Sequence, residues 1–450
     1  MSQWKKVKID FETVKLGDYI EPIKTTVGDL KIDNPVVYGV TNKEGIVQTG
    51  KPASEDVSKY IVLQENCFAF NPYRINVGSI GINEENLKGC VSPAYVVFKT
   101  KNGLLPKFLF FYLKSDYGIH LINWYGNRGG VRNALRYSDL CNIDIPDTRK
   151  LNQQALLDKF SFAAERIDEL SKEIEKQKSY AKKLRANILQ DAIEGKLTAD
   201  WREKHPIKKG NPDFDAEALF EKIQIEKQEK SKKQKPIPVI TEDEKPFAIP
   251  SGWKWTRLGD VTTLITDGKH GDSVNQNDSG FYFLSAKDIQ NEKLIYDSAR
   301  QITESDFYET HRRTNLEPGD ICVVNTGATV GKLAIAPNDP KTYRTTFQKS
   351  VAVVKLVKDY VNNEYIKFFL LNDVPRLMGK SWGSAINNLL LSDMRMELVA
   401  LPPLAEQKEI VARVKKHLET ITQLETQIAT RETLTKQLMQ GLLKDAFEER

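Results

Sequence analysis

Two stretches of this 450-residue sequence decide its fold: LDKFSFAAERIDELSKEIEKQKSYAKKLRANILQDAI at residues 157–193 and VARVKKHLETITQLETQIATRETLTKQLMQGLLKDAF at residues 411–447. They align without a gap at an offset of 254, and nine of the 37 aligned positions are identical. A repeat at this distance defines the architecture of a long chain before any single motif does. The chain is therefore expected to contain one structural plan twice.

Both stretches place apolar residues at the seven-residue spacing of a coiled-coil seam. Gln177, Arg431 and Thr435 interrupt the stripes and weaken a long self-associating zipper, so an intramolecular antiparallel pair of helices is the preferred interpretation. In the alternative, each helix only covers its own domain. The residues expected to pack between the helices are Phe160, Ile167, Leu170, Ile174, Leu184, Ile188, Val414, Ile421, Leu424, Ile428, Leu438 and Leu442.

The regions that precede the two helices also correspond. LGD at 16–18 returns at 258–260, and FNPYRINVGSIGI at 70–82 matches VNTGATVGKLAI at 324–335. Short β-branched runs bounded by Gly, Asn and Pro predict strands at 34–40, 59–64, 93–99, 319–325 and 350–356. The runs FLFFYLKS and EYIKFFLLND predict short buried helices. Each region is therefore a mixed α/β unit, and the fold class of the chain is α+β.

The repeat and the composition together define the domain boundaries. Residues 196–250 are rich in charge and then in proline, which predicts a solvated helix around 216–233 followed by an extended connector. The expected segments are a first globular unit at 1–150, a central spacer helix at 151–195, the charged helix and Pro-rich linker at 196–250, a second globular unit at 251–400 and a C-terminal spacer helix at 401–450.

The overall composition excludes several classes of protein. With 40% hydrophobic and 28% charged residues, the chain resembles an ordinary globular protein, and its net charge of +5 identifies no partner. The sequence contains no run of about 18 consecutive apolar residues, so no membrane span is expected. The N-terminus lacks the apolar run of a signal peptide, so export by that route is not expected. The four cysteines form no CxxC pair, which favours a reducing cytosol.

The common signatures of catalysis are incomplete. Asn71-Pro72-Tyr73 resembles an amino-methyltransferase tetrapeptide but lacks one proline, so a turn is the better interpretation. GATVGK at 327–332 has three residues between its glycines where a phosphate loop has four. The five histidines make no metal-ligand spacing. The sequence therefore predicts no catalytic residue, no metal site and no cofactor in this chain.

Local charge favours nucleic-acid binding. Residues 99–136 carry seven basic residues and one acid, and residues 341–388 carry eight and three, so net charges of +6 and +5 recur at equivalent places. Such patches neutralise phosphates, and Arg, Asn and Gln read base edges. In the alternative, these loops only cap a strand edge. The expected DNA contacts are Lys101, Asn127, Arg128, Arg132, Asn133, Lys269, His270, Arg344, Lys349, Lys380, Asn387 and Asn388.

Several motifs occur in the same order in both halves of the chain. Through them the chain resembles the specificity subunits of type I restriction-modification enzymes over nearly its whole length. The motifs are ITDGKHGD (265–272), FLSAKDI (283–289), GCVSPAYVVF (89–98), TGATVGK (326–332), WGSAINNLLLSDM (382–394), LPPLAEQKEIVARV (401–414), ILQDAIEGKLTADWRE (188–203) and IPSGWKWTRLGD (249–260). The first half departs from the pattern, since FNPYRINVGSIGI replaces the Thr-Gly-Ala form and IPDTRKLNQQALL replaces LPPLAEQKEIV. The motifs that carry the resemblance are therefore more complete in the second half than in the first.

This resemblance implies a non-catalytic DNA-binding subunit that takes part in phage defence in the bacterial or archaeal cytoplasm. Each globular unit would be a target recognition domain that reads one half of a bipartite DNA sequence, and the helices would set the spacer. Two methyltransferase subunits would supply S-adenosylmethionine for adenine-N6 methylation, and restriction/translocase subunits would use ATP and magnesium.

Two other functions stay open at the level of sequence. A self-contained DNA methyltransferase or nuclease would be active as the purified chain with its cofactor alone. A coiled-coil scaffold that does not bind DNA would be insensitive to the substitutions Arg128→Ala and Arg132→Ala, which weaken binding and its salt dependence if the loop contacts phosphates.

Overall fold

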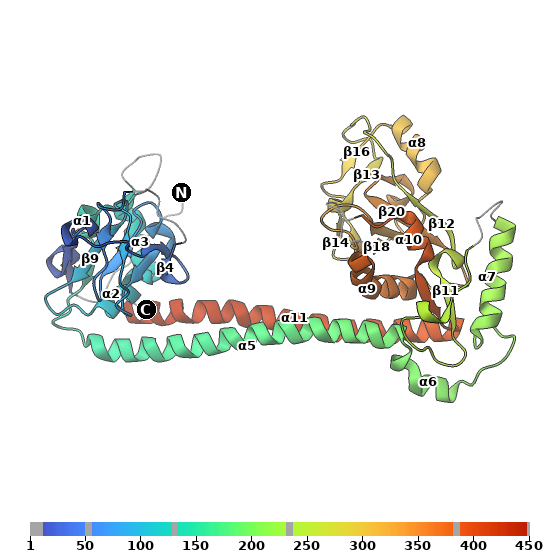
Figure 1. Ribbon diagram of the computed structural model, residues 1–450, viewed down its shortest axis with the longest axis horizontal. Helices are drawn as coiled ribbons and strands as arrows, with labels where there is room; N and C mark the ends of the chain where they lie inside the picture. Colours follow the sequence, from blue (N-terminus) through green and yellow to red (C-terminus); the bar gives the residue numbers. More distant parts are fainter. Residues whose placement is uncertain (1–11, 50–55, 128–133, 231–236, 381–387, 448–450) are drawn as a thin grey trace. The chain divides into compact units, whose positions relative to one another are not determined.

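The computed structural model describes residues 12–49, 56–127, 134–230, 237–380 and 388–447. The chain divides into two compact units (Figure 1). Unit 1 comprises residues 1–177 and 427–450, and unit 2 comprises residues 178–426. The division cuts both long helices, so each unit contains the first part of one long helix and the last part of the other.

Unit 1 is built on two four-stranded sheets. Their strand orders are β2-β9-β6-β7 and β4-β3-β8-β5. The strands are β2 (Ile20–Pro22), β9 (Val96–Thr100), β6 (Phe68–Phe70), β7 (Ile80–Ile82), β4 (Gly45–Gln48), β3 (Val37–Thr41), β8 (Cys90–Val91) and β5 (Ile61–Val62). Phe68 and Phe98 are fully buried, with stacked rings whose centroids lie 4.7 Å apart. Helices α2 (Pro106–Lys114), α3 (Asp116–Gly126) and α4 (Tyr137–Leu140) contribute to the same core.

Unit 2 contains a four-stranded sheet of order β12-β20-β17-β18 and a three-stranded sheet of order β16-β13-β19. The strands are β12 (Thr262–Asp267), β20 (Val351–Leu356), β17 (Ile321–Val324), β18 (Leu333–Ile335), β16 (Arg300–Gln301), β13 (Tyr282–Leu284) and β19 (Thr345–Phe347), with the hairpin β14 (Ile289–Gln290) and β15 (Lys293–Leu294). The helices are α8 (Glu304–Thr314), α9 (Asn363–Lys380) and α10 (Leu391–Met396). Strands β17 and β20 are buried almost throughout, which explains their continuous apolar runs.

The two units share several topological features. An antiparallel pair closes each globular region: β1 (Thr13–Lys15) with β10 (Asp144–Pro146), and β11 (Lys254–Arg257) with β21 (Leu398–Leu401). Each LGD motif then forms a 3-10 helix. Each second sheet contains one parallel pair, β3 with β8 and β13 with β19. The prediction of mixed α/β units is confirmed, and the predicted strands and short helices are present.

Two long helices follow the globular regions: α5 (Gln153–Ile193) with 41 residues and α11 (Leu404–Phe447) with 44. Within unit 2, Arg185 of α5 pairs with Glu425 of α11 at 3.7 Å. Further along the chain after α5, the carbonyl of Leu197 accepts a bond of 2.9 Å from Arg413, nearer the start of α11. Arg185 thus contacts a later residue of α11, and Leu197 contacts an earlier one. The two segments of unit 2 therefore run antiparallel.

The two predicted apolar lines on these helices differ in burial. The line with Ile174, Val414 and Ile421 is at most 5% exposed at these residues. The other line is 42–46% exposed at Leu170, Leu184, Leu424 and Leu438. Leu442, at the end of the first line, is 36% exposed. Both lines were expected to pack between the helices, but only the first is buried at these residues. One neighbouring helix covers only a narrow strip of each helix surface.

The segment between the halves packs on unit 2. It forms the 3-10 helix η3 (Lys196–Thr198) and the helices α6 (Ala199–Lys204) and α7 (Ala216–Lys230). The predicted helix around 216–233 is present, but Leu219 and Ile223 are fully buried and Lys227 donates to the carbonyl of Gly259 across 2.5 Å. The expectation of a solvated helix is therefore wrong for one face of α7. In the described part of the chain, no helix is long and apolar enough to span a membrane.

Candidate nucleic-acid interface

The loop that follows β12 brings together separate parts of unit 2. A Cβ atom at Gly268 would lie 1.9 Å from the carbonyl oxygen of Phe347, so only glycine fits at this position. The N–H of Lys269 donates to that oxygen across 2.8 Å, and the N–H of Lys349 donates to the carbonyl of Lys269 across 3.0 Å. The loop therefore places Lys269 and its neighbour His270 beside Lys349, three of the predicted DNA contacts.

Lys269 itself is turned into a contact with α8. Its Nζ atom lies 3.0 Å from Glu309 and 3.4 Å from Asp306, and its side chain is only 16% exposed. The hydrogen bond to Glu309 raises the pKa of Lys269, so the ammonium charge persists but is already paired. Lys269 thus joins the loop to α8, and little of its charge faces solvent.

Asp267, the last residue of β12, holds the side chains of an arginine and a histidine at the surface. Its carboxylate is 10% exposed, pairs with Arg313 of α8 and lies 2.8 Å from Nε2 of His270. Arg313 also donates from Nε to the hydroxyl of Thr266 across 3.3 Å. The side chains of Arg313 and His270 are 49% and 59% exposed. A largely buried carboxylate therefore orients two exposed side chains, the guanidinium of Arg313 and the imidazole of His270.

A second basic group lies before β19. The guanidinium of Arg344 lies 5.8 Å from the ring centroid of Phe281, and Nζ of Lys341 lies 5.4 Å from that of Tyr296. Both basic residues are exposed, and Tyr343 between them is 54% exposed. Cationic and aromatic side chains in this arrangement suit phosphates and stacked bases. Arg344, predicted from the sequence, belongs to this group.

The other predicted contacts are less completely placed. Lys101 and Asn127 of unit 1 are exposed. In unit 2, Asn388 accepts a bond of 3.0 Å from the hydroxyl of Thr326, next to the glycine-rich loop at 327–332. Lys380 ends α9, and its side chain is not among those described. Arg128, Arg132, Asn133 and Asn387 lie outside the described residues.

Counting charge along the sequence overestimates both basic patches. Acids from outside the two stretches pair with several of their lysines. The pairs are Lys99–Glu21 (3.0 Å), Lys107–Glu84 (3.6 Å), Lys355–Asp320 (2.6 Å), Lys358–Glu317 (2.6 Å) and Lys367–Glu292 (3.0 Å). The net charges of +6 and +5 therefore do not describe the folded surface, and the exposed basic residues named above are the candidates for DNA contact.

The motif that resembled a catalytic tetrapeptide forms a turn. The side-chain oxygen of Asn71 accepts the N–H of Tyr73 across 2.9 Å, which confirms the interpretation of Asn71-Pro72-Tyr73 as a turn. Burial raises the pKa of the Cys67 thiol to about 11 and also raises the pKa of the Cys322 thiol, so both thiols stay protonated at neutral pH. Among the described residues, no group of three His, Cys, Asp or Glu side chains could hold a metal ion.

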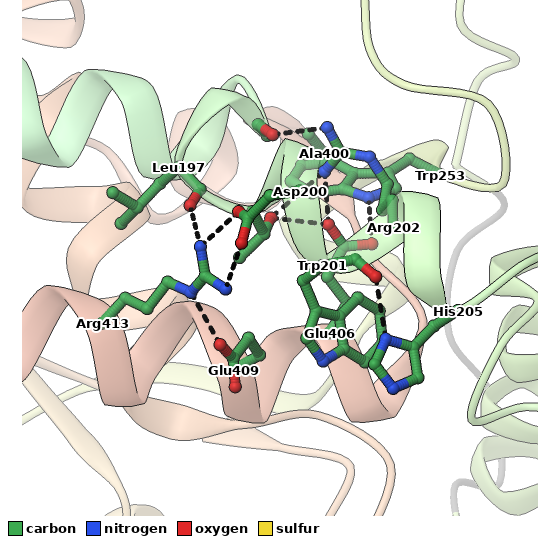
Figure 2. Close-up of polar contacts among 12 residues, drawn as sticks. Leu197, Asp200, Trp201, Arg202, His205, Trp253, Ala400, Glu406, Glu409 and Arg413 are labelled. Atoms are coloured by element: carbon green, nitrogen blue, oxygen red, sulfur yellow. Dashed lines mark hydrogen bonds and ion pairs between the residues drawn. The ribbon is translucent and has the colours of Figure 1, made fainter.

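A buried ion pair organises the junction between the linker and the start of α11 (Figure 2). Glu406 is 1% exposed and accepts bonds from Thr198 at 2.7 Å, from Trp253 at 2.8 Å and from Arg202. Two turns further along α11, Arg413 pairs with Asp200 at 2.5 Å and with Glu409 at 2.6 Å. Residues from three separate segments thus fix where α11 begins.

Asp267 and Arg313 are not among the contacts predicted from the sequence. Asp267 lies within the ITDGKHGD motif, and only Gly268 separates it from the predicted contacts Lys269 and His270. Arg313 lies in the basic His-Arg-Arg run at the end of α8, which no motif covered. The basic run at 311–313 is the sequence signal that indicates this site. It lies about 45 residues from the loop after β12 and outside both basic stretches.

Known proteins are similar to this chain. Residues 250–431 match the family described as "Type I restriction modification DNA specificity domain". The chain is 25% identical over 277 residues to the type I restriction enzyme EcoEI specificity subunit of Escherichia coli, a match that covers 59% of this chain and 45% of that subunit. It is 26% identical over 270 residues to the EcoAI specificity subunit of Escherichia coli, covering 58% of this chain and 44% of that subunit.

The chain therefore spans less than half the length of these two relatives. A solved structure described as "Structural basis underlying complex assembly and conformational transition of the type I R-M system" contains a chain with a TM-score of 0.64 to this one. The match covers 99% of both chains at 19% identity, so it shows likeness of fold alone.

Proposed function

We propose that this chain, whose residues 250–431 match the type I restriction modification DNA specificity domain family, is the non-catalytic DNA-recognition subunit of a type I restriction-modification complex. The observation that carries the proposal is the recurrence of one four-stranded sheet order and one closing strand pair in both globular regions, each followed by a long helix. A duplicated reader suits a DNA target in two parts.

Each globular region would read one half of a bipartite target. In unit 2, the exposed side chains of Arg313, Arg344 and Lys349 would supply donors for DNA, and the exposed imidazole of His270 lies beside them. Phosphate contacts hold the protein on the duplex, and forked donors read base edges. The halves would be read independently, because the loops after equivalent strands differ in sequence.

The long helices would form an antiparallel coiled coil that sets the spacer, with the two halves in a pseudo-twofold arrangement. Their opposite direction within unit 2 and the buried line of Ile174, Val414 and Ile421 support this proposal. A helix of 41 residues is about 60 Å long, which exceeds one duplex turn of roughly 34 Å.

The exposed leucine line would dock two methyltransferase subunits. Within unit 1, a groove of about 360 Å³ is lined by Leu170, Ile174, Leu434 and Leu438, with Glu173 and Arg431 among its polar residues. An apolar groove with charged edges suits an amphipathic partner helix. These partners would supply S-adenosylmethionine, and restriction/translocase subunits would supply ATP and magnesium chemistry in the bacterial or archaeal cytoplasm.

Single-molecule methylation sequencing of a host that carries this chain with its partner subunits tests the proposal. We expect one bipartite motif with a fixed spacer. Exchange of residues 1–150 for those of a relative with another specificity should change one half of the motif only. A continuous motif, a change in both halves, or methyl transfer by the purified chain without partners would each overturn the proposal.

A further inference from the structure

The side chains around Asp267 form a cluster more ordered than phosphate binding requires. A lone surface cation is sufficient for a phosphate, because the attraction is non-directional and sequence-independent. Arg313 is instead oriented by two acceptors, the carboxylate of Asp267 and the hydroxyl of Thr266. Such fixed orientation is what a directional contact with a base edge needs.

Helix α8 is itself held against the loop after β12. Asp306, Glu309 and Arg313 lie at positions i, i+3 and i+7, so they share one face of the helix. Asp306 accepts the N–H of Val274 across 2.5 Å, and both acids bind Lys269. Phe307, Thr310 and Thr314 are buried on a neighbouring face. The helix therefore cannot rotate without breaking these contacts, and the base of the Arg313 side chain is fixed.

We infer that Arg313 is a specificity-determining residue that reads a guanine, and that Asp267 is its positioning residue. The inference rests on the proposed function. Nε and Nη2 of the guanidinium contact Thr266 and Asp267, whereas Nη1 has no partner in the part of the chain that the structure describes. The side chain is 49% exposed, so the remaining donors face solvent. Guanine presents two acceptors, O6 and N7, to such donors in the major groove.

Preorganisation supports this assignment. An arginine that is already oriented loses less side-chain entropy on binding than a free one. Arg312, the preceding residue in the same helical turn, is exposed and has no partner among the described residues. It has the same charge without the carboxylate, which makes it the matched control within the chain.

The test uses the full chain, expressed with its partner subunits in a host without other methylation. Methylation motifs are compared for wild type, Arg313→Ala, Arg313→Lys, Asp267→Asn and Arg312→Ala. We expect Arg313→Ala and Arg313→Lys to accept other bases at one guanine of one half-site, with discrimination reduced roughly 10- to 100-fold, because lysine lacks the fork. Asp267→Asn should relax the same position less, and Arg312→Ala should keep the wild-type motif.

Competition binding to duplexes with the motif, or with that guanine replaced, gives a second measurement, and thermal unfolding identifies any variant that fails to fold. An unchanged motif in Arg313→Ala overturns the inference. So does a motif restored in full by Arg313→Lys, since charge alone would then suffice. Relaxation in the half-site assigned to residues 1–150 also overturns it. A wild type without a bipartite motif would instead contradict the proposed function.

Discussion

The indole N–H of Trp253 donates a hydrogen bond of 2.8 Å to the carboxylate of Glu406, which is 1% exposed. We expect Glu406→Ala to lower the free energy of unfolding of unit 2 by about 3 kcal/mol, because Arg202 and Trp253 lose their acceptor in a water-poor site. Thermal unfolding followed by circular dichroism measures the change. Glu409→Ala is the control, since its partner Arg413 keeps Asp200, and it should cost less than about 1 kcal/mol. Equal losses would contradict the role of Glu406.

Two glycines should respond in opposite directions to alanine. Gly268→Ala forces a Cβ atom to within 1.9 Å of the Phe347 carbonyl, so we expect a loss of about 1–3 kcal/mol in stability together with weaker DNA binding. Gly441 lies in α11 with no heavy atom within 4 Å of the added Cβ, so alanine there should gain up to ~1 kcal/mol. Calorimetry measures the stability of both variants. If Gly268→Ala does not lower stability, the loop can move to accommodate the added Cβ atom.

The two apolar lines on the long helices predict separable defects. Ile174 is 5% exposed, so Ile174→Ala should lower stability by about 2–4 kcal/mol. Leu170 and Leu438 are 46% and 45% exposed, so the double variant Leu170→Asp, Leu438→Asp should keep the unfolding temperature nearly unchanged. It should nevertheless lose co-purification with the methyltransferase subunit. If the charged variant still assembles, the groove is not the docking site.

Acid should remove one ion pair of the linker, between Glu244 and Arg257. The N–H of Thr241 and the Arg257 guanidinium both bind Glu244 and lower its pKa to about 2. A carboxylate with a lowered pKa in the folded state contributes stability above its unfolded pKa of about 4.3, and this contribution is lost as pH falls towards 2. Glu244→Gln should therefore be less stable than wild type at pH 7, and the difference should shrink between about pH 4.5 and 2. Urea unfolding across this range tests it, and a constant difference would be inconsistent with the pair.

DNA binding should depend on salt through the exposed basic residues. Lys349→Ala should weaken binding to all sequences alike and reduce the slope of log affinity against log salt by about 1, as expected for one phosphate contact. Lys107→Ala is the control, because this lysine already pairs with Glu84 at 3.6 Å. Fluorescence anisotropy at several salt concentrations measures both slopes. A larger effect from Lys107 would place the duplex on another face.

The duplicated plan was predictable because it rests on local patterns. Seven-residue apolar spacing predicts α5 and α11, and runs such as GDICVVN predict strands whose order then repeats. Burial along each helix was not predictable in the same way. Leu170 and Ile174 are equally apolar, and only the position of the neighbouring helix decides which one is covered.

The candidate interface was predictable only in part, because ion pairs connect residues distant in sequence. Lys269 was selected for its charge, but two acids of α8 bind it, about 40 residues away. Arg313 was overlooked since the carboxylate that orients it lies in another element. Sequence counts also missed acids such as Glu21, which neutralise lysines far along the chain.

Unit 1 is completed by residues 427–450, whereas unit 2 ends at residue 426. A ribosome makes the chain from the N-terminus, so residues 1–177 of unit 1 are synthesised first, all of unit 2 follows, and residues 427–450 of unit 1 come after it. Until α11 emerges in full, the backbone N–H of Asp116 lacks the side chain of Gln440 that accepts it at 3.1 Å, and the buried face around Ile174 lacks its neighbouring helix. The region made first is thus the last to be finished, and a nonsense mutation near residue 427 would leave unit 2 whole while depriving unit 1 of its final segment.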